Sequence, residues 1–153
     1  MRARGATLIE VLMFIVIISV AVVGILQVMN IVTGRSVDTL LRKQSLAIAE
    51  SVLEEIELKD FISVAGATNP VTLVNRAVEY HIVTDYAGFT TAGVFSASTG
   101  APIAGLGAYT VAVAVMPTAL GAIPAASSML ITVTVTDPQG TPVQISGYRT
   151  AYQ

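Results

Sequence analysis

Gly5-Ala6-Thr7-Leu8-Ile9-Glu10 leads into an apolar run over residues 11–26, and a short basic segment, Met1-Arg2-Ala3-Arg4, precedes it. In a secretory signal peptide, the small-residue cleavage site follows the apolar core instead of preceding it. Here the plausible cleavage site lies before the apolar run. We therefore predict that the apolar run remains in the mature protein.

Glu10 is a carboxylate at the head of a segment that is otherwise suited to hydrocarbon. An unpaired carboxylate in a bilayer core costs about 2 to 3 kcal/mol on insertion scales, so it is rarely left without a partner. The sequence has no lysine or arginine between Arg4 and Arg35. If the chain is cut after Gly5, the free amine of Ala6 on a neighbouring, axially staggered subunit can pair with Glu10 and set the register of assembly. The alternative is that Glu10 snorkels to the membrane surface.

The leader, the glycine, the Thr-Leu-Ile-Glu sequence and the apolar run together resemble the class III leader of type IV prepilins and pseudopilins. In that family a prepilin peptidase cuts after the glycine and methylates the new amino terminus. The resemblance assigns cleavage to the Gly5–Ala6 bond and methylation to Ala6, and it places Glu10 at the family's glutamate, five residues into the mature chain. One departure is Ala6 itself, because the family usually has phenylalanine there.

Proline is absent from Thr7 to Asp60, and apolar periodicity continues beyond the membrane run. We predict one long helix over residues 6–60, about 80 Å in length, with residues 8–29 in the membrane. Beyond Gly34 the pattern becomes amphipathic, which predicts a helix face that lies on a sheet. That face consists of Val37, Leu40, Leu41, Ile48, Val52 and Ile56.

Two leucines, Leu46 and Leu53, fall outside this face. They either widen the buried face or contact a neighbouring subunit, and the sequence leaves both interpretations open. The same part of the helix is rich in carboxylates, which helical spacing scatters around the axis, so we interpret them as a solvated face and not as a metal site. They are Glu50, Glu54, Glu55, Glu57 and Asp60.

Residues 61–153 are expected to form a β-rich head, which gives an α+β fold overall. Alternation of apolar and polar residues predicts strands over residues 76–83, 109–115, 129–136 and 143–152. Asp137-Pro138-Gln139-Gly140 has the composition of a turn and predicts a hairpin between the last two strands. Residues 85–107 are rich in Gly, Ala, Ser and Thr and are expected to form a long exposed loop.

The composition bounds the function. At 153 residues the chain fits one domain plus a helix, and a net charge of -2 argues against a nucleic-acid partner. Between Tyr86 and Tyr148 the only charged residue is Asp137, which suits a subunit that packs among others. Arg2 and Arg4 are expected to hold the leader on the cytoplasmic side. The sequence has no cysteine, so it forms no disulfide.

Catalysis is not expected, and no cofactor or metal is indicated. His81 is the only histidine, with Glu79 and Asp85 as its nearest acids, and no nucleophile motif accompanies it. We interpret His81 as structural. Near the C-terminus, Tyr148, Arg149 and Tyr152 form either a sugar-binding or partner-binding patch or cross-strand packing.

Several motifs narrow the resemblance to the minor pilins of mannose-sensitive haemagglutinin pili. It implies the pilin fold and a low-copy subunit that helps to initiate or decorate a type IV pilus used in surface attachment. The implied partners are prepilin peptidase, other pilin subunits and an inner-membrane assembly platform. The implied location is the inner membrane with the head in the periplasm, and then the cell-surface pilus. The motifs are residues 42–50, 53–56, 85–89, 131–136 and 147–150.

A second interpretation is a minor pseudopilin of a type II secretion system, in which a short filament pushes cargo. Major pseudopilins bind calcium through carboxylates in C-terminal loops, and here Asp137 is almost the only one available. A minor pseudopilin stays compatible with this sequence.

Overall fold

The computed structural model describes residues 7–61 and 69–151, apart from the side chains of residues 35 and 36. The predicted cleavage and methylation positions, Gly5 and Ala6, lie outside the described residues, as does Tyr152. The contacts divide the chain into a first unit that ends at Leu40 and a second unit that begins at Leu41. The two units are described separately.

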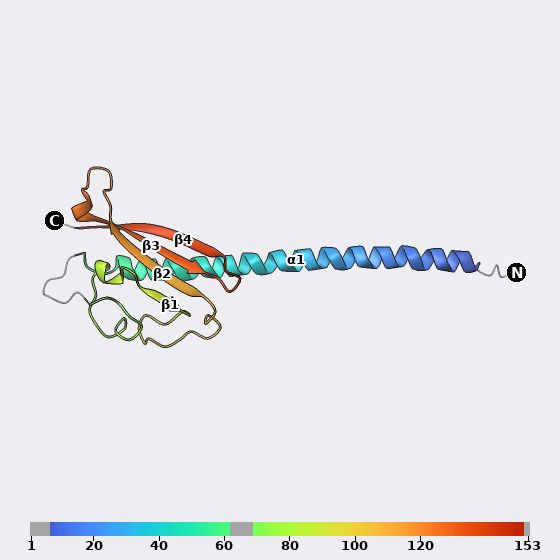
Figure 1. The fold of residues 1–153 in the computed structure, drawn as a ribbon, viewed down its shortest axis with the longest axis horizontal. Coiled ribbons are helices and arrows are strands. Elements are labelled where there is room, and N and C mark those ends of the chain that lie inside the picture. The colour runs from blue at the N-terminus through green and yellow to red at the C-terminus, as the bar shows by residue number, and fades with distance from the viewer. Residues whose placement is uncertain (1–6, 62–68, 152–153) are drawn as a thin grey trace. The chain divides into compact units, whose positions relative to one another are not determined.

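One helix, α1 (Leu8–Glu57), is 50 residues long, which confirms the predicted long helix (Figure 1). It begins where the N–H groups of Glu10 and Val11 both donate to the carbonyl oxygen of Thr7, at 3.0 and 3.2 Å. Its apolar part has a mean hydropathy of 2.9 over 18 residues, and by length and composition it is able to cross a membrane. The prediction of a membrane-spanning helix therefore agrees with the length and composition of α1.

The second unit contains a four-stranded antiparallel sheet with the strand order β1-β2-β3-β4 (Figure 1). The carboxyl-terminal part of α1 packs on this sheet, which confirms the predicted α+β layout. Two short 3-10 helices, η1 (Val83–Tyr86) and η2 (Ala125–Ser127), lie in the connections. The strands are β1 (Thr90–Ala92), β2 (Thr110–Pro117), β3 (Ser128–Thr136) and β4 (Pro142–Thr150).

The β3–β4 hairpin confirms the turn that the sequence predicted. The carboxylate of Asp137 accepts the backbone N–H groups of Gln139 and Thr141, both at 2.8 Å. Gly140 has a φ of 83°, which a glycine adopts without strain. An aspartate at the start of the turn and a glycine at its end therefore fix the register of the two strands.

The core lies between one face of α1 and the inner face of the sheet. Buried Ile48, Val52 and Ile56 of α1 confirm most of the predicted helix face, and Leu41 is half-buried beside them. Val37 and Leu40 are exposed, so their assignment to the buried face was wrong. They precede Leu41, where the second unit begins. On the sheet side the core residues are Val111, Val113, Ile131, Val133 and Val135.

Residues 76–83 do not form the predicted strand. This segment consists of turns, followed by one isolated bridge between Asp60 and Ile82 and then by η1. Local hydrogen bonds favour turns here, because the side-chain oxygen of Asn75 accepts the backbone N–H of Thr72 at 2.7 Å. The alternating residues mimic a strand, but the side chains of Arg76 and Tyr80 contact Glu55 and Asp60, far away in the sequence.

The segment 85–107 is not a wholly exposed loop. It contains β1, and Asp85, Tyr86, Phe89 and Thr91 are buried. The backbone N–H of Val113 also donates a hydrogen bond to the carbonyl oxygen of Phe89 at 2.8 Å. The first part of the segment is therefore a structural layer beside β2.

Candidate functional site

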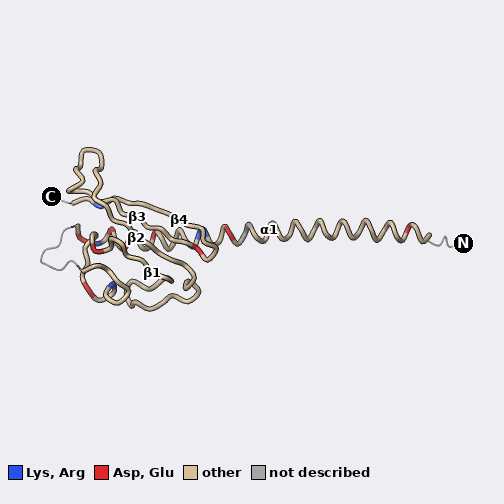
Figure 2. Tube along the Cα trace, in the orientation of Figure 1, with Lys and Arg blue, Asp and Glu red and all other residues tan. Residues whose placement is uncertain are grey.

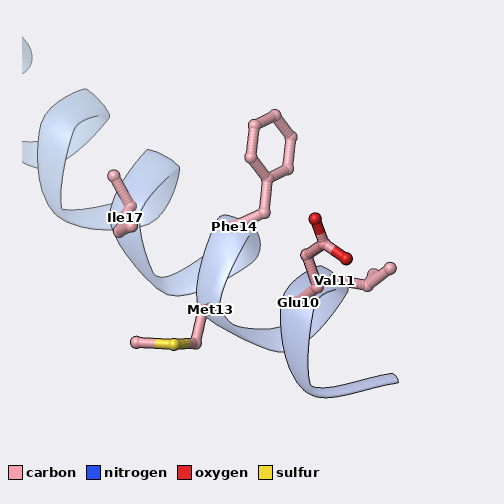
Figure 3. A pocket seen from close by; sticks show the side chains of 5 residues that line it. All are labelled: Glu10, Val11, Met13, Phe14 and Ile17. Atoms are coloured by element: carbon pink, nitrogen blue, oxygen red, sulfur yellow. The ribbon is translucent and has the colours of Figure 1, made fainter. Parts of the chain in front are cut away.

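Glu10 lies in the first turn of α1, and its side chain is exposed. Figure 3 shows its carboxylate on the same side of the helix as the ring of Phe14. The two residues are four positions apart, so they are neighbours on the helix surface. Glu10 belongs to a shallow surface hollow whose other lining residues are Val11, Met13, Phe14 and Ile17.

The carboxylate of Glu10 has no ionic partner among the described residues. It is the only charged residue of α1 before Gly34, and Figure 2 shows this half of the helix without any other charged position. A carboxylate near a helix N-terminus is favoured by the helix dipole, but that effect contributes only about 0.3 to 1 kcal/mol. The site thus combines one negative charge with apolar surroundings, and it is complementary to one cation.

The two leucines predicted as possible subunit contacts differ in the structure. Leu53 is half-buried against the core, and its methyl carbons are 3.3 Å from the place where a Cβ on Gly147 would be. Leu53 therefore belongs to a wider buried face. Leu46 is 38% exposed, so it stays available for a contact outside the chain.

Glu55 departs from the predicted solvated acidic face, because it lies in a part-buried polar cluster. Arg76 pairs with both carboxylate oxygens of Glu55, with Nε at 2.9 Å from Oε1. The hydroxyl of Tyr86 donates to the same Oε1 at 2.7 Å. The guanidinium also lies over the ring of Phe89, 5.5 Å from its centre.

This cluster sets the protonation of its members. Burial raises the pKa of Glu55, but the hydrogen bonds from Arg76 and Tyr86 outweigh it, and the net pKa lies below the ordinary value. Burial lowers the pKa of Arg76, and the bond to Glu55 reverses this effect, so the net pKa lies above the ordinary value. The cluster is therefore a charged pair that joins α1 to the segment before η1.

Sequence reasoning missed this pair, although the sequence carries a signal for it. Arg76 is the only lysine or arginine between Lys59 and Arg149. A single cation in such a charge-poor region requires a carboxylate when it is buried. Glu50, Glu54 and Asp60 are exposed, as predicted, whereas Glu55 and Glu57 are partly buried, so the prediction of a solvated face was wrong for those two.

His81 is fully buried, and its surroundings are those of a packed side chain. Its Nε2 lies 3.2 Å from the carbonyl oxygen of Asn75, and its Nδ1 lies 3.6 Å from the carboxylate of Asp85. That carboxylate accepts the backbone N–H of Ile82 at 3.1 Å, which fixes it at the start of η1. Among the residues that the structure describes, no three metal-ligating side chains come together.

For the C-terminal residues the sequence left two interpretations open, and the described ones, Tyr148 and Arg149, do not form a shared patch. Tyr148 and Arg149 are consecutive residues of β4, so their side chains lie on opposite faces of the sheet. Tyr148 is 40% exposed and is paired across the ladder with Leu130. Arg149 donates from Nε to the carbonyl oxygen of Lys59 at 3.3 Å and so holds the turn that follows α1.

Comparison of this chain with protein-family models, with curated proteins and with solved structures finds no match. Function is therefore inferred from the residues and their geometry. The feature with the clearest chemical requirement is the unpaired carboxylate of Glu10 on an apolar helix.

Proposed function

We propose that this chain is a minor pilin, a structural subunit of a type IV pilus of the mannose-sensitive haemagglutinin kind. It is cleaved by prepilin peptidase between Gly5 and Ala6, methylated on Ala6, and then assembled with other pilins to support attachment to surfaces. The observation that carries this proposal is the exposed carboxylate of Glu10, which heads a helix that is otherwise uncharged as far as Gly34.

The first half of α1 suits hydrocarbon in its side chains as well as its length. Residues 8–29 span about 33 Å as a helix, close to the thickness of a bilayer core of about 30 Å. The hydroxyl of Ser19 donates to the carbonyl oxygen of Ile15 at 2.7 Å, and that of Thr33 donates to Met29 at 2.9 Å. These hydroxyls are satisfied within the helix, so they do not require water.

Glu10 is the exception, and assembly supplies its partner. Cleavage after Gly5 creates an amine at Ala6, four residues before Glu10. A neighbouring helix shifted by about 6 Å along the axis would bring its own amine beside this carboxylate. The apolar side chains of Val11 and Phe14 beside the site exclude water and strengthen the attraction. The pair therefore selects one axial stagger between subunits.

The second unit suits a head that packs among other subunits. Between Tyr86 and Tyr148 its only charge is Asp137, so neighbouring heads do not repel one another. The two leader arginines favour a cytoplasmic leader and thus a periplasmic head before assembly. The partners of this proposal are prepilin peptidase, the assembly platform of the inner membrane and other pilins.

The test is incorporation of Glu10 variants into filaments. Glu10→Gln removes the charge at nearly constant shape, and Glu10→Ala removes the side chain. Both variants are expected to insert into the membrane normally and to fall by at least about tenfold in sheared filaments, because the intersubunit pair is lost. Quantitative immunoblots of the membrane and filament fractions measure this ratio.

The matched control is Glu54→Gln, which removes an exposed carboxylate of α1 outside the membrane part. It is expected to incorporate at the wild-type level. Incorporation of Glu10→Gln at the level of this control would show that Glu10 does not determine assembly.

A further inference from the structure

β4 forms one edge of the sheet, and its outer side is unpaired in the part of the chain that the structure describes. Figure 1 shows β4 at the rim of the sheet. An edge strand presents backbone donors and acceptors that another extended segment can bond. The chemistry of this surface therefore selects a β-strand as its ligand.

The hydrogen bonds at the two ends of the hairpin identify which residues face outward. The N–H of Ala151 donates to Ser127 at 3.0 Å, and the N–H of Asp137 donates to Thr141 at 3.1 Å. In an antiparallel ladder, residues alternate between bonded and non-bonded positions. Residues 141 and 151 are both hydrogen-bonded to residues on the β3 side. The backbone N–H and C=O groups of the odd-numbered residues of β4 therefore point toward β3. The N–H groups that point away from β3, toward the unpaired edge, belong to Gln144, Ser146, Tyr148 and Thr150.

This edge lacks most of the features that protect natural edges. Such edges are short, bulged, or blocked by proline and lysine. β1, at the other edge, has three residues, whereas β4 has nine and pairs with β3 without a bulge. Its proline is at the first position, Pro142, and its only charge is Arg149. β4 thus offers a long, regular edge.

α1 provides a second recognition element beside this edge. Leu53 and the carboxylate of Glu57 both lie against Gly147 of β4. Residues three or seven positions earlier share the same side of a helix, which places Leu46 and Glu50 on the β4 side as well. Leu46 is 38% exposed, and Glu50 is exposed. The same spacing places exposed Lys43 beside Leu46 and Glu50. A strand added to β4 would therefore extend over one leucine, two carboxylates and one lysine, a surface with a net negative charge.

We propose that the outer edge of β4 binds an extended segment of a partner protein as a fifth strand of the sheet. The side chains of this segment that point toward α1 are apolar and basic, because they meet Leu46, Glu50 and Glu57. The side chains of this segment that point away from α1 are uncharged, as are those of the neighbouring Gln144 and Ser146. Binding also completes the burial of Val143 and Ile145, which are only partly covered on the inner face. This proposal does not depend on the proposed function.

The experiment uses the full chain in detergent micelles, labelled with nitrogen-15, and a synthetic nine-residue peptide. The peptide alternates threonine with valine or lysine, and a control peptide has glutamate in place of lysine. Without peptide, the N–H groups of Ser146 and Tyr148 are expected to exchange faster than those of Ile145 and Gly147. Saturating lysine peptide is expected to slow their exchange by at least about tenfold.

Two variants, one of them with a matched control, separate edge pairing from charge. Ser146→Pro deletes an outward N–H without removing a bond to β3, and it should abolish binding, whereas Ser146→Ala keeps the N–H and should bind normally. Glu50→Lys leaves the strand unchanged. It should weaken the binding of the lysine peptide by about tenfold and strengthen the binding of the glutamate peptide. This second variant keeps the test valid if the proline variant loses its native spectrum.

Three results would overturn the proposal. The first is that Ser146 and Tyr148 are already as protected as Ile145 in the peptide-free protein. The second is unchanged exchange at saturating lysine peptide. The third is protection that increases with protein concentration without peptide, because it would mean that a second copy of the chain occupies the edge.

Discussion

At the scale of single residues, charged side chains in this protein are few, and the described ones have distinct environments. Glu10 is exposed without an ionic partner among the described residues, whereas Glu55 is enclosed by Arg76 and Tyr86. The first arrangement suits an intermolecular contact, and the second stabilises the fold. The difference follows from burial, because a buried charge is tolerated only when it is paired within the chain.

The Glu55–Arg76 pair predicts a large effect of removing one partner. Arg76→Ala is expected to lower the free energy of unfolding by about 3 kcal/mol, because it leaves a part-buried carboxylate unpaired. Tyr86→Phe, which removes one hydrogen bond, should cost about 1 kcal/mol. Urea unfolding followed by circular dichroism measures both. The control Lys43→Ala removes an exposed cation and should change stability by less than about 0.5 kcal/mol.

The same pair predicts acid sensitivity. The pKa of Glu55 in the folded chain lies below its ordinary value of 4.5, so its stabilising contribution is complete above that pH. The contribution is lost as the pH falls through the lower, folded pKa. Glu55→Gln should therefore be less stable than the wild type at pH 7, and the gap should narrow by pH 3. A gap that stays constant over this range would contradict the assignment.

At the scale of elements, the packing of α1 on β4 depends on a glycine. A Cβ on Gly147 would meet the carboxylate of Glu57 and would lie 3.3 Å from the methyl carbons of Leu53. That separation is tighter than ordinary van der Waals contact, so a larger residue has to displace the helix or these side chains. The close approach explains why a strand interior tolerates glycine here.

Gly147→Ala is accordingly expected to destabilise the second unit by about 1 to 2 kcal/mol. Ser146→Ala, the matched control on the outer face, should stay within about 0.5 kcal/mol of the wild type. The double variant Gly147→Ala/Glu57→Ala should recover part of the loss, because the Cβ then has room. Thermal unfolding of all four proteins tests this. Equal stability of the two single variants would show that the close approach is not limiting.

The comparison of sequence with structure is clearest for particular elements. The β3–β4 hairpin was predictable because Asp137 and Gly140 encode its turn locally. The strand predicted over residues 76–83 was wrong because Arg76 and Tyr80 contact Glu55 and Asp60, far away in the sequence. β1 was missed because three residues carry too short a pattern.

The residues of the candidate site also differ in whether the local sequence or long-range packing determines their environment. Glu10 was predictable because one charge in an apolar run is visible in the sequence. The enclosure of Glu55 and the position of Leu53 against Gly147 were not, since both depend on how α1 packs on the second unit. Local patterns therefore identified Glu10 as a candidate, and long-range contacts determined the environments of Glu55 and Leu53.

At the scale of the whole molecule, the chain combines a helix able to cross a membrane with a compact α+β unit that begins at Leu41. The two parts have different chemistry. The first is apolar on all sides and carries one charge before Gly34, whereas the second has a sheet core and few charges. The proposed function, a subunit that passes from the membrane into a filament, requires both kinds of surface.

Mass spectrometry of this protein in sheared surface filaments tests the central claim most directly, because it reads the amino terminus and the abundance together. A methylated chain that begins at Ala6, present at low stoichiometry relative to other pilins, is the predicted result. A chain that begins at Met1 and occurs only in the membrane fraction would contradict it, since no amine at Ala6 would then exist to pair with Glu10.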